Sequence, residues 1–513
     1  MIFKARLANA LALLAVTLTV GTARAAQPAL GDLDAYVHAA MAQWKVPGLA
    51  VAVVKDGKVV LARGYGVREL GKPAPVDADT LFDIASNTKA FTAAALGTLV
   101  AEGRLQWDDP VVQYIAGFRL DSPYVTQEIT LRDLLTHRSG YCDPFDMWYA
   151  ADDTVANIIA RLQYQKPSYG FRARFCYNNA MYMVASRFIP AIAGVSWNSY
   201  VSTRFFGPLG MTRTVSTASA VAASSDVAVP HGEVNDTVQV IKPYWSNNMD
   251  VFAAVGGINS SVRDMSHWLI MLLADGRYED EQVLPPSVIQ AMETPQMVVD
   301  PGSDLGGWLR TQTPNARFYA YGLGLFLQDY GGQQLVWHAG DIDGMASALG
   351  MVPDQHLGVV VLSNMNGNRA PEGIMFHVLQ DYLGLPHRDV SGAMYAYIQQ
   401  EKAQSDAASQ KLSAAGRPGA QAPLPLAAYA GSYSDAFYGD VSVQQESGHL
   451  VLHMGNPMFV GDLQPWNGNT FRVRWRYRFY GDTYITFDVD ALGKPARLTF
   501  AESSAQYGRA PSR

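Results

Sequence analysis

The stretch LFDIASNTKAFTAAALGTLVAE, residues 81–102, is the most informative part of the sequence. Its second half is rich in alanine and leucine, which predicts an α-helix over residues 88–102 that ends at Gly103. Ser86 and Lys89 are three positions apart and therefore share one face of the helix start. A lysine whose pKa is lowered by burial can take the proton of a serine and make it a nucleophile. The same spacing is also typical of a serine that only caps an ordinary helix.

Patterns of β-strands lie on both sides of this helix in the sequence. Residues 48–67, GLAVAVVKDGKVVLARGYGV, predict two strands joined at an Asp-Gly turn. Residues 345–364 predict a second pair around a Pro-Asp turn. Further helices are expected over residues 110–116, 130–137 and 260–275, the last two begun by capping Thr and Ser residues. Strands at both ends with helices between them predict one α+β domain over residues 27–395.

The C-terminal part of the sequence has a different composition. Residues 396–425 are rich in Ala, Gln, Ser, Gly and Pro, and we interpret them as a linker that can begin as the end of a helix. Residues 426–508 alternate apolar and polar residues between Gly, Asn and Asp turns. This alternation predicts a small antiparallel β-barrel or β-sandwich as a second domain.

The first 25 residues have the features of a secretory signal peptide. Lys4 and Arg6 precede an apolar run over residues 7–20, and Ala23-Arg24-Ala25 offers a cleavage site. The alternative is a short membrane anchor, but the apolar run is short for a membrane span. We therefore expect a periplasmic or secreted protein that is cleaved after Ala25 and has no membrane span in the mature chain.

Charge and cysteine content exclude several classes of function. The chain has 39 Lys and Arg against 46 Asp and Glu, so it lacks the basic surface that nucleic-acid binding requires. Two cysteines, Cys142 and Cys176, do not make a structural zinc motif. His449 and His453 share a strand face but lack a third ligand. We expect neither a cofactor nor a metal ion, and a small molecule or a peptide as the substrate.

Two further segments carry residues with catalytic chemistry. In Tyr177-Asn178-Asn179, a tyrosine hydroxyl can relay a proton and an amide can orient a substrate. In the segment from Trp337 to Asp341, His338 precedes Ala339 and Gly340, and this glycine lets another backbone approach the strand. Taken singly, each segment is more often structural: a buried tyrosine, a helix cap or a satisfied histidine.

Together, the three segments have the order and spacing of a known family. SxxK, then YxN, then HxG resembles the penicillin-recognising serine hydrolases of the class C β-lactamase type, which include D-aminopeptidases, D,D-carboxypeptidases and esterases. Further segments that resemble family signatures are ITLRDLLTHRSG, FFGPLGMTRT, GGINSSVRDMSHWL and YGLGL. The resemblance implies a β-lactamase-like fold, in which an antiparallel sheet packs against a helical region, followed by a small lipocalin-like barrel.

The resemblance also implies roles for individual residues. Ser86 is expected to be the nucleophile that forms an acyl-enzyme, with Lys89 and Tyr177 moving protons; which of the two is the base stays open. Asn179, His338 and Gly340 are expected to bind substrate. The backbone N–H groups of Ser86 and Asp341 would form the oxyanion hole.

One departure from the family pattern bears on the substrate. Where β-lactamases of this type usually carry lysine in a KTG triplet, this chain has His338, which lacks a permanent positive charge. The sequence therefore favours a peptidase or amidase that acts on short peptides, including D-residue peptides. An esterase, a weak β-lactamase and a non-catalytic penicillin- or peptidoglycan-binding protein are the alternatives.

Three expectations concern the surroundings of the site. By resemblance, Cys142 and Cys176 border the same cleft, and export would allow a disulfide between them; two unpaired buried thiols are the alternative. The barrel is expected to cover the cleft, to mediate oligomer assembly, or to be a passive stabilising module. Aromatic residues between Gly140 and Gly170 either form a substrate wall or pack as an ordinary loop: Tyr141, Phe145, Trp148, Tyr149, Tyr164 and Tyr169.

Overall fold

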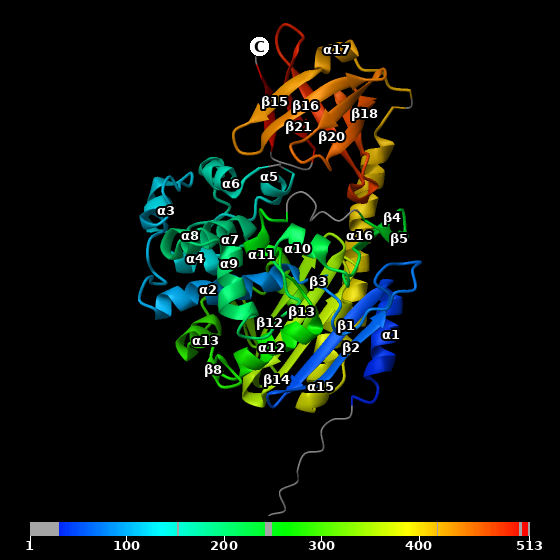
Figure 1. Ribbon diagram of the computed structural model, residues 1–513. Coiled ribbons are helices and arrows are strands. Elements are labelled where there is room, and N and C mark those ends of the chain that lie inside the picture. Colours follow the sequence, from blue (N-terminus) through cyan, green and yellow to red (C-terminus); the bar gives the residue numbers. More distant parts are fainter. Residues whose placement is uncertain (1–29, 151–152, 242–248, 418, 502–504, 511–513) are drawn as a thin grey trace, which may run out of the picture.

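The structure is a computed structural model that describes residues 30–150, 153–241, 249–417, 419–501 and 505–510. An α+β domain forms the larger part, and an all-β barrel lies at one end of it (Figure 1). The predicted signal peptide lies outside the described residues. None of the helices within the described ranges is long and apolar enough to cross a membrane.

An eight-stranded antiparallel sheet forms the centre of the larger domain, in the order β2-β1-β14-β13-β12-β11-β10-β9. The bounds are β1 Gly48–Lys55, β2 Lys58–Gly66, β9 Met297–Val298, β10 Tyr319–Tyr321, β11 Phe326–Tyr330, β12 Gln333–Ile342, β13 Met345–Val352 and β14 Leu357–Ser363. In β1, Leu49 and Val51 face one hydrophobic core, and Ala50 and Ala52 face the other. Both faces of the sheet are therefore covered, which explains the nearly continuous apolar run of this strand.

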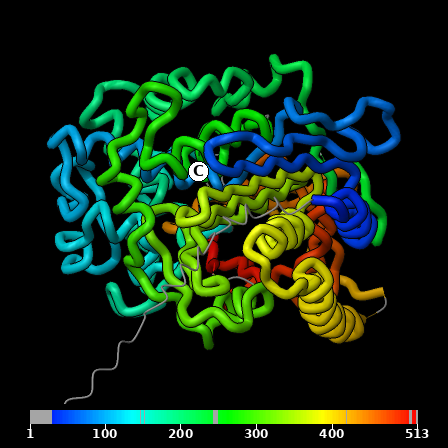
Figure 2. Tube along the Cα trace, turned by 90° about the horizontal axis from the view of Figure 1, so that it is seen from below, coloured from blue at the N-terminus to red at the C-terminus, as the bar shows by residue number. Residues whose placement is uncertain are grey.

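Helices cover the two faces of the sheet (Figure 2). One face is covered by α1 (Leu33–Trp44), α15 (Ala370–Leu383) and α16 (Val390–Ala414). The other is covered by α12 (Val262–Leu273) and by the helical region around α2 (Thr88–Ala101). The remaining helices are α3 Pro123–Glu128, α4 Leu131–Leu135, α5 Phe145–Tyr149, α6 Val155–Arg161, α7 Asn179–Ser186, α8 Phe188–Ala193, α9 Trp197–Val201, α10 Ala218–Ala223, α11 Ala253–Gly256, α13 Pro286–Met292, α14 Asp304–Gln312 and α17 Leu426–Tyr429.

Short elements complete the α+β domain. The 3₁₀ turns are η1 Ala85–Asn87, η2 Val111–Gln113, η3 Leu162–Tyr164 and η6 Pro353–Gln355. The short strand pairs are β3 Phe82–Asp83 with β6 Asn259–Ser260, β4 His231–Val234 with β5 Thr237–Val240, and β7 Arg277–Tyr278 with β8 Glu281–Gln282. The segment expected to be helical over residues 110–116 contains only η2, whereas α4 and α12 begin at capping side chains of Thr130 and Ser261.

The predicted linker is shorter than its composition suggested. Residues 396–414 belong to α16, which has 25 residues and continues the chain from the sheet toward the barrel (Figure 1). Ala, Gln, Lys and Glu are strong helix formers, and the first glycine of the segment is Gly416. Residues 396–414 are thus the end of a helix, as the interpretation allowed, because a polar composition does not by itself prevent a helix.

The C-terminal strands close into an eight-stranded antiparallel barrel. Their bounds are β15 Gly431–Asp435, β16 Gly439–Glu446, β17 His449–His453, β18 Val460–Asn467, β19 Thr470–Trp475, β20 Asp482–Val489, β21 Pro495–Phe500 and β22 Gln506–Arg509, with η7 Arg478–Tyr480 before β20. Buried aromatic rings pack together in it, among them Tyr429, Tyr433, Phe471 and Phe487. Closure pairs the first strand with the last, so the barrel confirms one of the two expected all-β architectures.

Candidate active site

Ser86 lies in η1, between the short strand β3 and the long helix α2. The preceding residue, Ala85, has a φ of 48°, in the left-handed region that a residue with a Cβ rarely adopts. Its N–H donates to the Asp83 carboxylate at 2.7 Å, which holds this conformation. Such backbone strain is typical of functional sites, where the surrounding structure fixes one side chain in place.

Lys89 and Tyr177 both donate hydrogen bonds to the Ser86 hydroxyl oxygen. The Lys89 Nζ–Ser86 Oγ distance is 3.0 Å, and the Tyr177 hydroxyl lies 2.9 Å from the same oxygen. Lys89 Nζ also lies 4.9 Å from the centre of the Tyr177 ring. Ser86 and Tyr177 are 91 positions apart in the sequence. The structure brings both together with Lys89, at the distances required between a nucleophile and the groups that move its proton.

Burial tunes the proton affinities of these groups. Lys89 is fully buried, and this burial lowers the pKa of Lys89 to about 7, although the charge of Asp143 opposes the change. Its remaining contact is a hydrogen bond to the Val255 carbonyl oxygen at 3.0 Å. Burial instead raises the pKa of Tyr177 above its ordinary value. Lys89 is therefore a base near neutral pH, while Tyr177 keeps its proton.

Asn179 is held by a buried carboxylate. Its backbone N–H and its side-chain Nδ2 each donate to Asp143, both at 2.8 Å. Burial raises the pKa of Asp143, and the two bonds from Asn179 oppose that change. The amide of Asn179 is thereby fixed in orientation, with its nitrogen toward Asp143.

Gly340 allows strand β12 to pack against the turn that carries Ser86. A Cβ at this position would lie 2.5 Å from the Ile84 carbonyl oxygen and 2.8 Å from the Ala85 Cβ. Glycine is thus required for the close approach of β12 to η1. The next residue, Asp341, pairs through its side chain with Arg369 at 2.8 Å.

His338 is buried and neutral. Its Nδ1 bonds the Ala339 carbonyl oxygen at 2.5 Å, which can only accept, so this nitrogen carries the proton. Its Nε2 then accepts from the Tyr321 hydroxyl at 3.0 Å. Burial, reinforced by the charge of Lys89, lowers the pKa of His338 to about 3. A neutral ring agrees with the expectation that His338 lacks a permanent positive charge, and it results from the enclosure of the ring.

Cys142 and Cys176 form a disulfide, with 5.1 Å between their Cα atoms. The bond joins the two segments that carry Asp143 and Tyr177. Two backbone hydrogen bonds lie beside it. The Asp143 N–H donates to the Tyr177 carbonyl oxygen at 3.0 Å, and the Cys176 N–H donates to the His137 carbonyl oxygen at 2.8 Å. The disulfide thus fixes the position of Tyr177 relative to Asp143.

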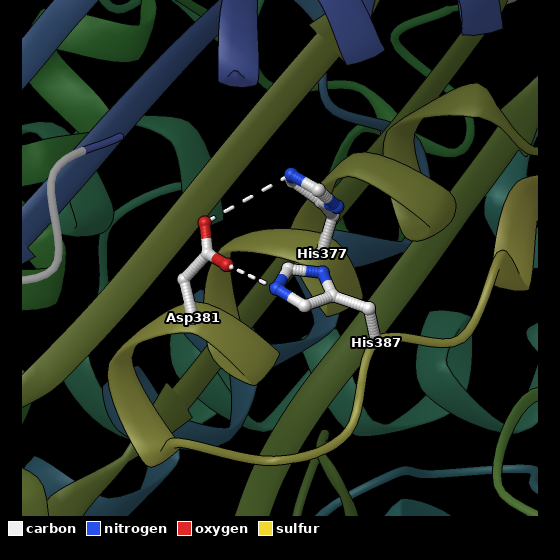
Figure 3. Close-up of side chains that lie close together, drawn as sticks. All are labelled: His377, Asp381 and His387. Carbon is white, nitrogen blue, oxygen red and sulfur yellow. Dashed lines mark ion pairs between the residues drawn. The ribbon is translucent and has the colours of Figure 1, made fainter. Parts of the chain in front are cut away.

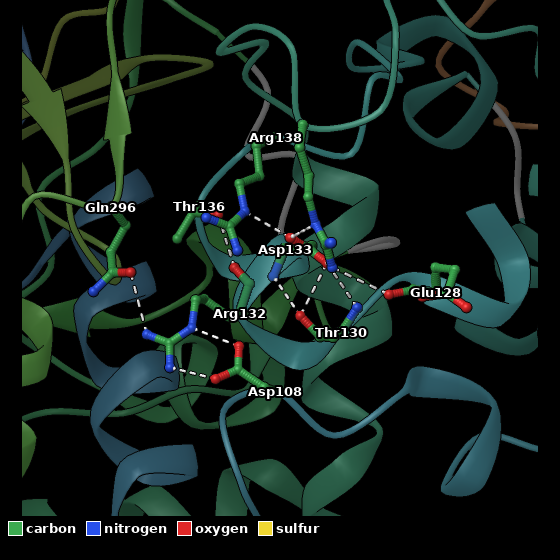
Figure 4. Close-up of polar contacts among 9 residues, drawn as sticks. Asp108, Glu128, Thr130, Arg132, Asp133, Thr136, Arg138 and Gln296 are labelled. Atoms are coloured by element: carbon green, nitrogen blue, oxygen red, sulfur yellow. Dashed lines mark hydrogen bonds and ion pairs between the residues drawn. The ribbon is translucent and has the colours of Figure 1, made fainter. Parts of the chain in front are cut away.

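A buried carboxylate, Asp133, is the centre of a network of polar contacts near these segments (Figure 4). Asp133 accepts from Arg138 Nε at 2.6 Å and from Arg172 Nη2 at 2.7 Å, and its side chain is completely buried. Burial alone raises the pKa of Asp133, but the hydrogen bonds from Arg172, Thr130 and Arg138 outweigh it and lower the pKa. This network ties the loop after α4 to the segment that precedes Tyr177.

Two cavities flank Ser86. The narrower has a volume of about 240 Å³, and its aromatic walls are Phe145, Trp148, Tyr149 and Phe252. The wider has a volume of about 550 Å³, and its walls include Tyr169, Phe175, Tyr177, Trp308, His338 and Arg369. Four of the aromatic residues between Gly140 and Gly170 line the two cavities: Phe145, Trp148, Tyr149 and Tyr169. Tyr141 is buried but lines neither cavity, and Tyr164 is exposed.

The barrel contacts the rear wall of the narrower cavity. The hydroxyls of Tyr149 and Tyr480 both donate to Asp343 Oδ2, the second at 3.1 Å. Asn456 of the barrel donates to the Tyr149 carbonyl oxygen at 3.0 Å, and Phe459 stacks on Tyr480 with 4.4 Å between the ring centres. The barrel therefore contacts a wall of the cleft directly, through Tyr480, Asn456 and Phe459.

Comparison with known proteins places this site in a family. Residues 33–382 match the family model described as beta-lactamase, which is more than half of the chain. The chain belongs to the beta-lactamase family. Residues 415–510 match a domain of unknown function, DUF3471, and this range contains the barrel.

Relatives of this beta-lactamase-family chain include fungal and bacterial proteins. An unguisins hydrolase of Aspergillus violaceofuscus is 30% identical over 455 residues, which cover 83% of this chain and 78% of that protein. Protein flp of Staphylococcus aureus is 28% identical, over 66% of this chain and 64% of that protein.

Solved structures share the fold. The octameric penicillin-binding protein homologue from Pyrococcus abyssi has a TM-score of 0.60 at 24% identity, covering 93% of this chain and 99% of that one. SurE has a TM-score of 0.54 at 20% identity, covering 93% and 98%. The β-lactamase-like fold that the sequence predicted is confirmed.

Sequence reasoning missed several residues of this beta-lactamase-family site. His137 stacks on Tyr177 with 4.2 Å between the ring centres, and its Nδ1 accepts from the Asn178 N–H. Asp143, Tyr321 and Arg369 hold Asn179, His338 and Asp341 respectively. His137 lies in a segment already similar to a family signature, so a signal existed for it. Tyr321 likewise begins the family-like segment YGLGL, whereas Asp143 and Arg369 are brought in by tertiary packing and had no local signal.

Proposed function

We propose that the chain is a serine hydrolase that works through an acyl-enzyme on Ser86. The observation that carries this proposal is the Ser86 oxygen, which has Lys89 Nζ at 3.0 Å and the Tyr177 hydroxyl at 2.9 Å. Ser86 Oγ attacks the substrate carbonyl carbon, and the bond to the leaving group breaks to give the ester of Ser86. Water then hydrolyses this ester and restores the serine.

Lys89 is the base of the first step in this proposal. Its pKa of about 7 leaves a substantial unprotonated fraction at neutral pH, whereas Tyr177 holds its proton there because burial raises its pKa. Lys89 takes the Ser86 proton, and Tyr177 donates its own to the leaving group and recovers one through the same hydrogen-bonded set. Deacylation runs the transfers in the opposite sense.

The developing oxyanion needs donors on the other side of the carbonyl. The backbone N–H groups of Ser86 and Asp341 are proposed for this role, since Gly340 brings β12 against η1. Removing one donor of this kind costs about 3 kcal/mol of transition-state stabilisation in other hydrolases.

The proposed substrates are short peptides or amides, including those with D-residues. His338 is neutral, and Arg369 is already paired with Asp341, so neither supplies a free positive charge for a substrate carboxylate. This favours neutral acyl donors over β-lactams. The printed name of one relative, an unguisins hydrolase, supports hydrolysis as the activity. Esters fit the same acyl-enzyme route and are the second candidate.

We also propose that the protein is exported, as its first 25 residues suggest. The disulfide between Cys142 and Cys176 supports this proposal, because disulfides persist in oxidising compartments. For the barrel, its contacts with the wall of the narrower cavity support the role of a cleft cover. Assembly through the barrel stays a prediction; an octameric protein is among the structural neighbours.

A fluorescent phosphonate and a substrate panel test this function. The probe is expected to label the wild-type chain at Ser86 and to leave Ser86→Ala unlabelled. Against D-amino-acid amides, p-nitrophenyl esters and nitrocefin, we expect turnover of amides or esters and slow or no turnover of nitrocefin. Ser86→Ala is expected to lose about 10⁴-fold or more of kcat while it keeps the wild-type circular dichroism. Equal activity of the two proteins would reject the nucleophile, and rapid turnover of nitrocefin alone would reject the substrate class.

A further inference from the structure

A second cluster of reactive side chains lies at the C-terminal end of α15, on the face of the sheet opposite to α2. His377 and Asp381 are four positions apart on this helix and so point in the same direction (Figure 3). The helix ends at Gly384, whose φ of 61° reverses the chain and returns His387 to the same place. Three side chains with metal-binding atoms thus converge from one helix and its C-terminal turn.

The distances within this cluster are those of a ligand set. The nitrogen and oxygen atoms that His377, Asp381 and His387 offer all lie within 4.8 Å of one another. His387 Nε2 lies 3.0 Å from Asp381 Oδ1, and His377 Nε2 lies 3.8 Å from Asp381 Oδ2. Ligand atoms around one tetrahedral zinc ion are about 3.3 Å apart, which follows from bond lengths of 2.0–2.1 Å.

Residues at the start of α1 surround His377 without joining the three atoms that meet within 4.8 Å. Asp32, the residue before α1, places its Oδ1 3.3 Å from His377 Nε2. Tyr36 of the same helix stacks on the His377 ring, with 4.0 Å between the centres and 7° between the planes. This stacking fixes the orientation of the ring, as second-shell contacts do in known metal sites.

One atom of the cluster has no hydrogen-bond partner in the protein. Asp381 Oδ2 is buried and accepts no hydrogen bond, and the Asp381 side chain is only 9% exposed. A buried carboxylate oxygen without a donor is costly, so such atoms call for an explanation such as an ion. The Asp381 and His377 side chains are enclosed, whereas His387 and Asp32 are 57% and 65% exposed, which leaves a path for a cation from solvent.

We propose that His377, Asp381 and His387 bind one zinc ion, with water in the fourth position of the tetrahedron. Two imidazole nitrogens and one carboxylate oxygen are a donor set that suits zinc, whereas calcium and magnesium prefer oxygen ligands alone. The sequence predicted no metal site, because these three residues match no known metal motif.

The ion would fix the turn that follows α15, and His377 would link it to Asp32 and Tyr36 at the start of α1. These two helices cover the face of the sheet away from Ser86, so the site is structural and does not enter the hydrolysis. An ion that binds the folded chain alone stabilises it in proportion to its concentration. Zinc is therefore expected to raise the unfolding temperature without a change in kcat.

The proposal is tested on the full chain, purified with an affinity tag that lacks histidine and freed of metal with EDTA. Zinc is titrated against a chromophoric chelator with the wild type, with His387→Gln, and with His449→Gln. His449 is the matched control, because it also pairs with a carboxylate at 3.0 Å but lies in the barrel, where no three metal-binding side chains of the described residues meet. Cobalt(II) is added to the wild type as a probe of geometry.

The expected result is one zinc ion per wild-type chain, with an affinity that His387→Gln lowers at least about 10-fold and His449→Gln leaves unchanged. Cobalt(II) should give the intense visible bands of a tetrahedral site, a readout that holds even if His387→Gln fails to fold. The absence of stoichiometric zinc from the wild type, an octahedral cobalt spectrum, or equal affinities of the two variants would each overturn the proposal.

Discussion

The two cavities beside Ser86 differ in volume and in what lies behind them. The narrower one, about 240 Å³, is aromatic and backs onto the barrel through Tyr149 and Tyr480. The wider one, about 550 Å³, is lined by Tyr177 and holds a guanidinium, Arg369, that Asp341 already neutralises. Because Tyr177 protonates the leaving group in the proposed mechanism, the wider cavity is the leaving-group side and the narrower one receives the acyl group.

The difference teaches which part of the substrate the fold restricts. The smaller cavity has aromatic walls that pack against the barrel, so it is expected to select the acyl group by shape. A longer acyl group would contact these closely packed rings. The wider cavity imposes less on the leaving group. Charge makes little distinction between the two, because Asp343 accepts from two tyrosine hydroxyls on one side and Arg369 is paired with Asp341 on the other.

The largest effect that distinguishes the two sides is expected from Tyr177→Phe. Loss of the hydroxyl removes the proton donor on the wider side and should lower kcat by about 10²–10⁴-fold. Tyr182→Phe is the matched control, since Tyr182 also lies beside Lys89, 5.5 Å from its Nζ, but donates to the Leu135 oxygen. Steady-state rates on one amide and one activated ester measure both. If the two variants lose activity equally, the role of Tyr177 is wrong.

The disulfide is expected to have the next largest effect. Replacing Cys142 and Cys176 together by Ser opens a loop of 34 residues, which should lower the free energy of unfolding by about 3–4 kcal/mol. Urea denaturation followed by tryptophan fluorescence measures this change. Because Cys176 lines the wider cavity, KM for bulky leaving groups should rise more than KM for bulky acyl groups. An unchanged denaturation midpoint would contradict this prediction.

Two exposed aromatic residues, one in each cavity, test the assignment of the substrate halves. Phe145, 47% exposed, lines the narrower cavity, and Tyr169, 41% exposed, lines the wider one. Phe145→Ala should raise kcat/KM for bulky acyl groups relative to small ones by about 10-fold. Tyr169→Ala should instead change the relative kcat/KM of substrates that differ in the leaving group. A matrix of esters that vary one half at a time measures both. The opposite pattern would exchange the two assignments.

The smallest effect is expected at the contact with the barrel. Tyr480→Phe removes one hydrogen bond to Asp343 and should lower the free energy of unfolding by about 1 kcal/mol. The exposed Tyr124, changed to Phe, is the control and should leave stability unchanged. Denaturation curves of the two variants, recorded side by side, make the comparison. A destabilisation as large for Tyr124→Phe would show that the loss is not specific to Asp343.

Local sequence was sufficient to predict the parts of the site that are close along the chain. Ser86 and Lys89 share a helix start, and the Asp-Gly turn after β1 joins two strands as predicted. The family resemblance supplied Tyr177, which no local rule connects to Ser86. The barrel followed from the alternation of apolar and polar residues, because each of its strands buries one face. The antiparallel sheet was implied by the family resemblance.

Properties that depend on burial could not be predicted in this way. The neutrality of His338 results from its enclosure beside Lys89 and Tyr321, which the triplet HAG does not reveal. The pairing of Asp341 with Arg369 joins strand β12 to the residue before α15. The extent of α16 stayed open for a different reason, since its exposed polar surface resembles that of a linker. In each case the deciding contact or surface lies outside the motif.

The pH dependence of phosphonate labelling tests the central claim most directly, namely that buried Lys89 is the base for Ser86. Burial holds the pKa of Lys89 at about 7, so the ammonium form predominates below that pH and the free amine above it. The rate of labelling of wild type is therefore predicted to rise with pH through a midpoint near 7 and then to level off. A rate that is flat across this range, or that rises only near the ordinary lysine pKa of about 10.4, would contradict the account.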